Sequence, residues 1–142
     1  MNHPKAIVHL DRLAKNYKIL SNSVNGKRLM AVVKANAYGH GAIECSRKLE
    51  DQGCDFFSVF TVEEAEELRN AGLKSDILIL SKLEKKSIKT AIYNDLIVNI
   101  SSIVDLDSII FYLEKNGLSP RFHMKIETGM NRLGFDLSDI YL

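Results

Sequence analysis

One lysine stands where a strand is expected to end and a glycine-containing loop to begin. The apolar run 29–33 leads into Lys34, and Tyr38, Gly39 and Gly41 follow before the next helical pattern. In a parallel α/β fold, the loop after a strand lies on the face where ligands bind. Apolar walls favour the neutral form of a lysine amine, which is the nucleophile that attacks an aldehyde. The segment therefore predicts a covalent binding site at Lys34, with a solvated lysine in a turn as the alternative.

The loop after this lysine also has features that suit a phosphate group. Gly39 and Gly41 permit positive φ and a close backbone approach just before a helix. The free N–H groups at the N-terminus of that helix would attract an anion, and Tyr38 offers a hydroxyl donor. His40 is interpreted as a loop or packing histidine.

A second segment with chemical potential runs from Met124 to Phe135. It is again a strand that ends in a glycine-containing loop, so Arg132 is expected on the same face as Lys34. The planar guanidinium can hold an oxyanion, such as a phenolate or a carboxylate. A surface arginine in a turn is the alternative.

Alternating apolar and amphipathic stretches must position these residues. Strands are expected at 6–10, 29–34, 56–60, 76–80, 96–100 and 121–127, and helices at 11–22, 42–52, 61–71, 82–94 and 102–116, with another helix beginning at 138. The alternation predicts βαβ units and a parallel sheet. A closed eight-stranded barrel needs roughly 200 residues or more, so the 142 residues predict an α/β fold, a partial TIM (β/α) barrel truncated before closure.

One expected helix begins with a recognisable cap. Thr61 is followed three residues later by Glu64, which is the spacing of a capping box. The neighbouring acids Glu63, Glu66 and Glu67 share this helix with Glu64. All four are expected to form its solvated face near the positive end of the helix dipole.

Composition narrows the classes of partner. The chain carries 19 basic and 18 acidic residues, interspersed, for a net charge of +1, so neither nucleic acid nor a membrane surface is expected as a partner. No apolar run is long enough to span a bilayer, and the segment from Met1 to Lys5 is not expected to begin a signal peptide. Cys45 and Cys54 lack the spacing of a metal site and are interpreted as reduced thiols of a cytoplasmic protein.

Both chemical segments resemble one family. The run from Val32 to Gly41 resembles the pyridoxal phosphate (PLP) motif of the alanine racemases, which implies that Lys34 binds PLP as a Schiff base and that Tyr38 contacts its phosphate. The run from Met124 to Phe135 resembles the family stretch in which an arginine contacts the cofactor's ring oxygen and the substrate, which implies those roles for Arg132. In that family a lysine seven residues earlier supports the arginine, often as a carbamate, and Lys125 has this position. Residues 10–17 resemble the family's first helix more loosely.

The resemblance implies an isomerase that interconverts L-alanine and D-alanine through a PLP aldimine, supplying D-alanine for peptidoglycan. Lys34 would be one of two bases, and the other would be a tyrosine from a C-terminal β-domain, supplied across a homodimer interface. Residues 1–142 are expected to be the N-terminal part of the PLP-binding barrel, a fragment without that β-domain. Tyr141 is not expected to replace the missing tyrosine.

Three alternatives stay open at the level of sequence. They are a non-catalytic PLP-binding barrel protein, an inactive truncated gene product, and part of a racemase that prefers serine. The Ala-Asn-Ala-Tyr-Gly-His-Gly loop at 35–41 resembles the racemases more than the PLP carriers.

Overall fold

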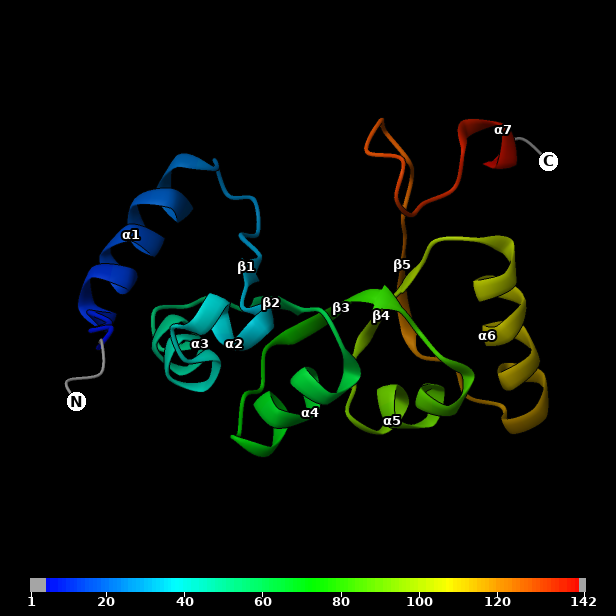
Figure 1. The fold of residues 1–142 in the computed structure, drawn as a ribbon, viewed down its shortest axis with the longest axis horizontal. Helices are drawn as coiled ribbons and strands as arrows, with labels where there is room; N and C mark the ends of the chain where they lie inside the picture. Colours follow the sequence, from blue (N-terminus) through cyan, green and yellow to red (C-terminus); the bar gives the residue numbers. More distant parts are fainter. Residues whose placement is uncertain (1–4, 141–142) are drawn as a thin grey trace.

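Strands alternate with helices along almost the whole chain (Figure 1). The computed structural model describes residues 5–140, so Tyr141 and the segment before Lys5 lie outside the described residues. The strands are β1 (Ala31–Val32), β2 (Phe56–Val59), β3 (Asp76–Lys82), β4 (Ile97–Ile100) and β5 (Arg121–Met124). The helices are α1 (Leu10–Ser23), α2 (Lys34–Gly39), α3 (Ala42–Glu50), α4 (Val62–Asn70), the 3₁₀ turn η1 (Lys85–Ser87), α5 (Ile88–Tyr93), α6 (Ile103–Asn116) and α7 (Leu137–Ile140).

Within residues 5–140 the strands form one parallel sheet in the order β1-β2-β3-β4-β5. Each strand is thus next to the strand that follows it in sequence, which is the order of a barrel and not of a doubly wound sheet. The ring of Phe56 on β2 lies 5.9 Å from that of His123 on β5, centroid to centroid, although β3 and β4 separate these strands. The sheet is therefore strongly curled, which confirms the expected partial barrel.

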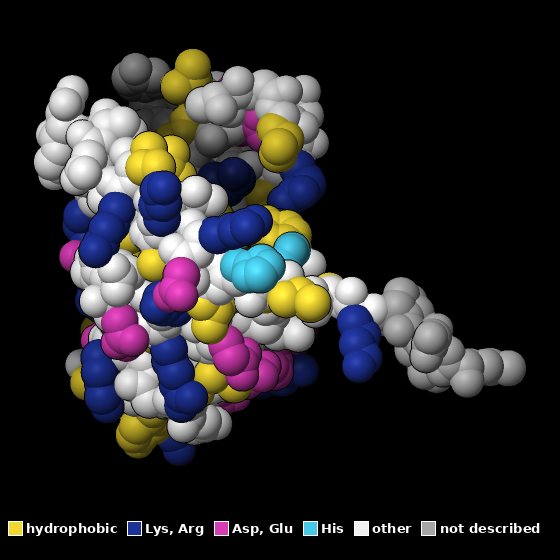
Figure 2. Space-filling view, turned by 90° about the vertical axis from the view of Figure 1, so that its left-hand side faces the viewer, with side chains coloured by type: hydrophobic (Ala, Val, Ile, Leu, Met, Phe, Trp, Pro, Cys, Tyr) yellow, Lys and Arg dark blue, Asp and Glu magenta, His cyan; other side chains and the backbone are white. Residues whose placement is uncertain are grey.

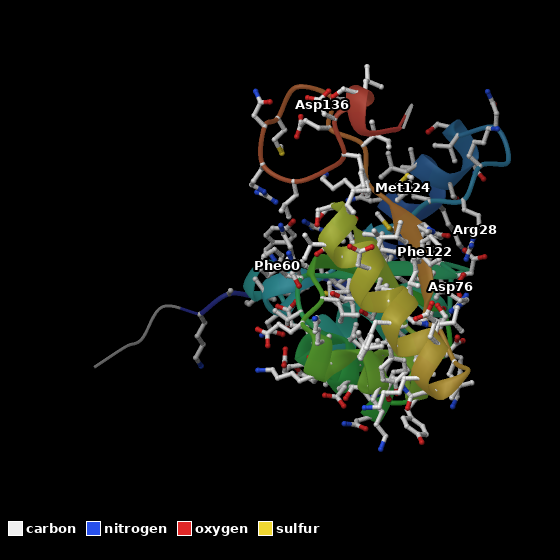
Figure 3. All side chains as sticks on the ribbon, turned by 90° about the vertical axis from the view of Figure 1, so that its right-hand side faces the viewer. Arg28, Phe60, Asp76, Phe122, Met124 and Asp136 are labelled. Atoms are coloured by element: carbon white, nitrogen blue, oxygen red, sulfur yellow. The ribbon has the colours of Figure 1, made fainter. Side chains whose placement is uncertain are left out.

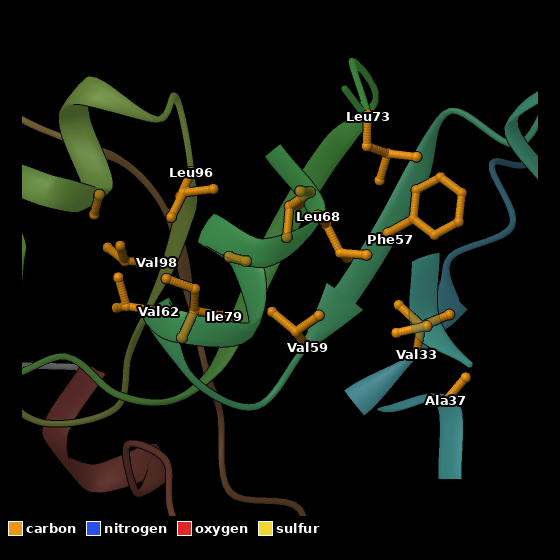
Figure 4. Packing of buried hydrophobic residues seen from close by; sticks show 14 of the residues in the cluster. Val33, Ala37, Phe57, Val59, Val62, Leu68, Leu73, Ile79, Leu96 and Val98 are labelled. Carbon is orange, nitrogen blue, oxygen red and sulfur yellow. The ribbon is translucent and has the colours of Figure 1, made fainter. Parts of the chain in front are cut away.

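The main core lies between the outer face of the sheet and its helices, with α4 packed across β2 and β3 (Figure 4). Side chains of a strand alternate between its two faces. Ile77 and Ile79 on β3 are fully buried on the helix side with Phe57, Val59 and Val98. The intervening residues Leu78 and Leu80 are left for the concave face, where a site can form.

The helix caps follow the sequence closely. Thr61 and Glu64 form both halves of a capping box at the start of α4, as predicted. The hydroxyl of Ser102 accepts a hydrogen bond from the N–H of Asp105 at the start of α6, and Gly117 ends that helix in the left-handed conformation. These local signals place the ends of α4 and α6, and with them the strands that follow.

Several expected elements differ from the structure. The strands expected at 29–34 and 121–127 are shorter, since β1 is only Ala31–Val32, Lys34 already begins α2, and β5 ends at Met124. The strand predicted at 6–10 is wrong, since residues 5–9 have no regular structure and Leu10 begins α1. An apolar run becomes a strand only beside a partner strand, and none lies there within the described residues. The helix predicted at 82–94 begins later, because Lys82 still belongs to β3 and the chain then forms η1 and α5.

Ion pairs bind the amino-terminal ends of the strands together. Asp76 pairs with Arg28 and with Arg121, each at 2.8 Å, and so links the segment before β1 to β3 and β5 (Figure 3). Both arginines lower the pKa of Asp76, the hydrogen bond from Arg28 most strongly. This network lies at the amino-terminal ends of the strands, opposite to the loops that carry Lys34 and Arg132.

Positive and negative charges are mixed on the surface that Figure 2 shows. Figure 2 shows acidic and basic side chains interspersed on the face that includes α1. Lys48 on α3 pairs with Asp11 on α1 at 2.7 Å and fastens that helix to the body of the molecule. In the part of the chain that the structure describes, no helix is long and apolar enough to cross a membrane.

Candidate cofactor site at the carboxyl ends of the strands

The chain turns sharply after β1, and this turn carries Lys34. Val33 is buried and donates from its N–H to the carbonyl of Ser58 on β2, at 2.9 Å. The next four residues after Lys34, Ala35 to Tyr38, all have φ between 51° and 55°. This is one turn of left-handed helix, a conformation that costs a residue with a Cβ roughly 1–2 kcal/mol. Such a conformation persists only where its surroundings hold it.

Hydrogen bonds to several parts of the chain hold the left-handed turn. The carboxylate of Glu64 accepts from the N–H of Ala35 at 2.8 Å, and the side chain of Asn36 accepts from the N–H of Ala42 at 2.7 Å. The N–H of Ala37 bonds to the carbonyl of Val33 at 2.9 Å, and the ring of His40 bonds to the carbonyl of Ala37 at 2.8 Å. His40 therefore has a local structural role, in line with its interpretation as a loop histidine.

The helix N-terminus after the turn differs from the expectation of a free anion site. The side chain of Asn36 takes the first N–H of α3, at Ala42. Tyr38 lies on the turn but is 60% exposed and does not line the cavity next to Lys34. Its predicted contact with a phosphate stays a prediction.

The loop that carries Arg132 is folded back onto the end of β5. The N–H of Phe135 donates to the carbonyl of Lys125 at 2.8 Å, and the N–H of Glu127 donates to the carbonyl of Phe135 at 2.9 Å. A Cβ at Gly134 would lie 2.7 Å from the backbone nitrogen of Glu127, so only glycine permits this approach. The buried ring of Phe135 anchors the returning chain.

Glu127 organises the inside of this loop. Its carboxylate accepts hydrogen bonds from the N–H groups of Gly129 and Arg132. Backbone N–H groups, foremost those of Asn131 and Gly129, lower the pKa of Glu127. The loop thus folds around this carboxylate, and Arg132 on the same loop lines the cavity beside the sheet.

A cavity of about 260 Å³ lies between the two loops, on the concave face of the sheet. It brings together three of the four site residues that the sequence predicts, Lys34, Lys125 and Arg132. The other lining residues are Leu78, Leu80, Asn99, His123, Met124 and Leu133. The whole lining contains Lys34, Lys125 and Arg132 and no carboxylate, a combination that suits an anion with apolar surfaces.

Sequence reasoning missed several residues of this region. Asn99 and His123 line the cavity because they are inward positions of β4 and β5, a signal that strand alternation carries. Glu64 was expected on a solvated face, but it is half-buried and bonded to the Lys34 turn, so that expectation is wrong for Glu64. Glu63 and Glu67 are exposed, as expected, whereas Glu66 is half-buried and accepts a hydrogen bond from Asn94, so the expectation is wrong for Glu66 too.

Comparison with known proteins points to a single family. Residues 8–141 match the family described as the N-terminal domain of alanine racemase. The chain is 38% identical over 135 residues to an alanine racemase of Staphylococcus carnosus, covering 94% of this chain and 35% of that protein. It therefore spans about a third of the length of the curated relatives that it matches.

Solved structures agree with the sequence matches. An alanine racemase from E. faecalis superposes with a TM-score of 0.84 at 35% identity, covering 90% of this chain and 35% of that one. An alanine racemase from Bartonella henselae with covalently bound pyridoxal phosphate gives a TM-score of 0.88 at 27% identity, covering 94% of this chain and 39% of that one.

Proposed function

Since the chain belongs to the family of alanine racemase N-terminal domains, we propose that it forms the N-terminal barrel portion of an alanine racemase and holds pyridoxal phosphate at Lys34. The observation that carries the proposal is the cavity in which Lys34, Lys125 and Arg132 meet. These residues come from the ends of β1 and β5, at opposite edges of the described sheet.

The donor set of the cavity suits this cofactor. Pyridoxal phosphate is an anion with a planar aromatic ring, and the lining combines three basic groups with leucine and methionine side chains. Lys34 would hold the cofactor covalently, Arg132 would face its ring oxygen, and Lys125, once converted to a carbamate anion, would support Arg132. Tyr38 would reach the phosphate from the exposed side of the turn. When bound, the cofactor supplies an electron sink for the α-carbon of an amino acid.

Some residues of this chain would bind the substrate, and Lys34 would transfer the proton. The amine of Lys34, freed by the arriving substrate, takes or returns the proton at the α-carbon. Arg132 holds an oxyanion, the substrate carboxylate included. Leu78, Leu80 and Leu133 keep water from the reacting carbon.

The activity of the whole protein requires more than these residues. Exchange of a proton between the two faces of the α-carbon needs a second base, which we assign to a C-terminal domain outside this chain. Alanine as the substrate and a homodimer as the complete assembly belong to the same proposal.

Covalent trapping tests the role of Lys34 directly. The chain is mixed with pyridoxal phosphate and reduced with borohydride, and the modified lysines are mapped by mass spectrometry. Labelling is expected mainly at Lys34 and should disappear in Lys34→Ala. Lys89→Ala, which changes a lysine on α5 beside Tyr93, should keep the label at Lys34. Labelling spread over many lysines would contradict the proposal.

A further inference from the structure

We propose that Glu64 is a positioning residue, which fixes the amine of Lys34 by holding the backbone of Ala35, the next residue, and of Phe60, whose ring lies beside that amine. The inference rests on the proposed function of Lys34. Glu64 lies on α4, 30 residues after that lysine, and does not line the cavity.

The two oxygens of the Glu64 carboxylate have different partners. Oε1 accepts from the N–H of Ala35 at 2.8 Å. Oε2 accepts from the N–H of Phe60 at 2.6 Å and from that of Thr61 at 3.3 Å. One side chain therefore joins the Lys34 turn to the end of β2 and the start of α4.

Both carboxylate oxygens of Glu64 bind backbone groups close to Lys34. Ala35 follows Lys34 directly, and its N–H belongs to the peptide that opens the left-handed turn. The ring of Phe60 lies beneath the amine of Lys34, with 5.7 Å from Nζ to the ring centroid. Because Glu64 holds the backbone of both residues, it sets the lysine relative to the ring that borders it.

A helix cap does not account for this geometry. The capping box at the start of α4 needs only the bond from Thr61 to Oε2 and the bond from Glu64 to the Thr61 hydroxyl. The bond from Ala35 to Oε1 adds nothing to that cap. The bond from Ala35 instead stabilises the strained turn, because it gives the first N–H of that turn a charged acceptor.

The two roles can be separated by a pair of substitutions. Glu64→Gln keeps a residue that is compatible with a capping box, but a carboxamide has one acceptor oxygen and cannot serve both Ala35 and Phe60. Thr61→Ala removes the hydroxyl half of the cap and leaves the carboxylate in place. Glu67→Gln is the surface control on the same helix.

Three measurements are made on each full-length variant. Hydrogen exchange reports on the amides of Ala35 and Phe60. Acetylation by a small anhydride, mapped by mass spectrometry, reports on the amine of Lys34 relative to the other lysines. Pyridoxal phosphate labelling with borohydride reports on binding. In Glu64→Gln we expect faster exchange at Ala35 or Phe60, and labelling of Lys34 reduced by roughly tenfold, since hydrogen bonds to charged groups are among the stronger ones.

The outcomes distinguish this inference from the proposed function. Unchanged exchange in Glu64→Gln, or an equal loss of labelling in Thr61→Ala, would overturn the positioning role. Faster exchange with unchanged labelling would also overturn it. If the wild-type chain itself shows no preference for Lys34 in labelling, the proposed function fails. In that case the acetylation measurement tests the role of Glu64 by itself. This role stands only if the acetylation rate of Lys34, relative to the other lysines, changes in Glu64→Gln and not in Thr61→Ala or Glu67→Gln.

Discussion

Two carboxylates near the cavity accept hydrogen bonds from backbone N–H groups. The charged side chains that line the cavity are all basic. Glu64 holds the turn that follows Lys34, and Glu127 holds the loop that carries Arg132. Neither lines the cavity. A carboxylate inside it would pair with the basic groups that a bound anion needs. The arrangement therefore provides order at the site without cancelling its positive charge.

Replacing Glu127 should loosen the Arg132 loop and leave the rest of the fold intact. In Glu127→Gln the neutral side chain accepts fewer and weaker bonds from Gly129 and Arg132. Trypsin cleavage after Arg132 should then become about fivefold faster, by the usual strength of such bonds. The control is Glu114→Gln on the exposed side of α6. An unchanged cleavage rate after Arg132 would show that Glu127 does not order the loop.

An ion pair between the buried Asp105 and the half-exposed Lys82 gives the stability of the molecule a pH dependence. Burial raises the pKa of Asp105, but bonds from Lys82 and Ser101 outweigh it, and the pKa is lowered overall. The Lys82 amine lies 2.9 Å from the carboxylate and joins β3 to α6. A lowered pKa means that the stabilisation is complete above the usual pKa of an aspartate and is lost as the pH falls through the lowered value.

Asp105→Asn should therefore lower the free energy of unfolding near neutral pH and flatten its decline in acid. We expect a loss of about 2 kcal/mol, less than for a fully buried pair, because the Lys82 side chain is 55% exposed. Urea unfolding at several pH values measures both effects. Asp107→Asn is the matched control, and parallel pH curves for wild type and Asp105→Asn would refute the assignment.

At the scale of the element, the turn after β1 is strained and carries the lysine that we propose to hold the cofactor. Ala35, Asn36, Ala37 and Tyr38 are all left-handed although none is glycine. Ala37 is nevertheless buried and packs near Val33 in the core (Figure 4). The tertiary structure thus stabilises a local conformation that the backbone alone disfavours.

Relief of this strain should be measurable. Ala35→Gly removes a Cβ from a left-handed position and should raise the free energy of unfolding by about 1 kcal/mol. Ala71→Gly, at a right-handed helix end, should lower it instead. Thermal and urea unfolding compare the two variants. A loss of stability in Ala35→Gly would mean that its φ is not strained.

The elements that sequence predicted are those with local signals. Thr61, Ser102 and Gly117 mark helix ends through contacts within a few residues, and the structure has all three caps. Lys34 and Arg132 could be placed on one face because the carboxyl ends of parallel strands share an edge. The left-handed turn and the reach of Glu64 to Ala35 depend on contacts across 29 residues. No local pattern encodes such contacts.

At the scale of the whole molecule, the sheet is curled but open between β1 and β5. All four residues of β5 are exposed, and within residues 5–140 this strand pairs only with β4. Phe122 and Met124 are about half exposed on it (Figure 3). The adjacent α6 exposes Ile110, Phe111 and Leu113. An unpaired strand edge next to apolar side chains promotes association between chains.

We therefore expect the isolated chain to self-associate as its concentration rises. Sedimentation velocity measures this, and Phe122→Lys should shift the equilibrium toward monomer by placing a charge on the edge strand. Tyr93→Lys adds the same charge at a more exposed ring on α5, away from the edge, and should change little. Only Phe122→Lys should reduce association. If Tyr93→Lys reduced it equally, the cause would be general charge repulsion and not the edge of β5. A wild-type chain that stays monomeric at every concentration, with a sharp cooperative unfolding transition, would mean that the open edge is no site of association.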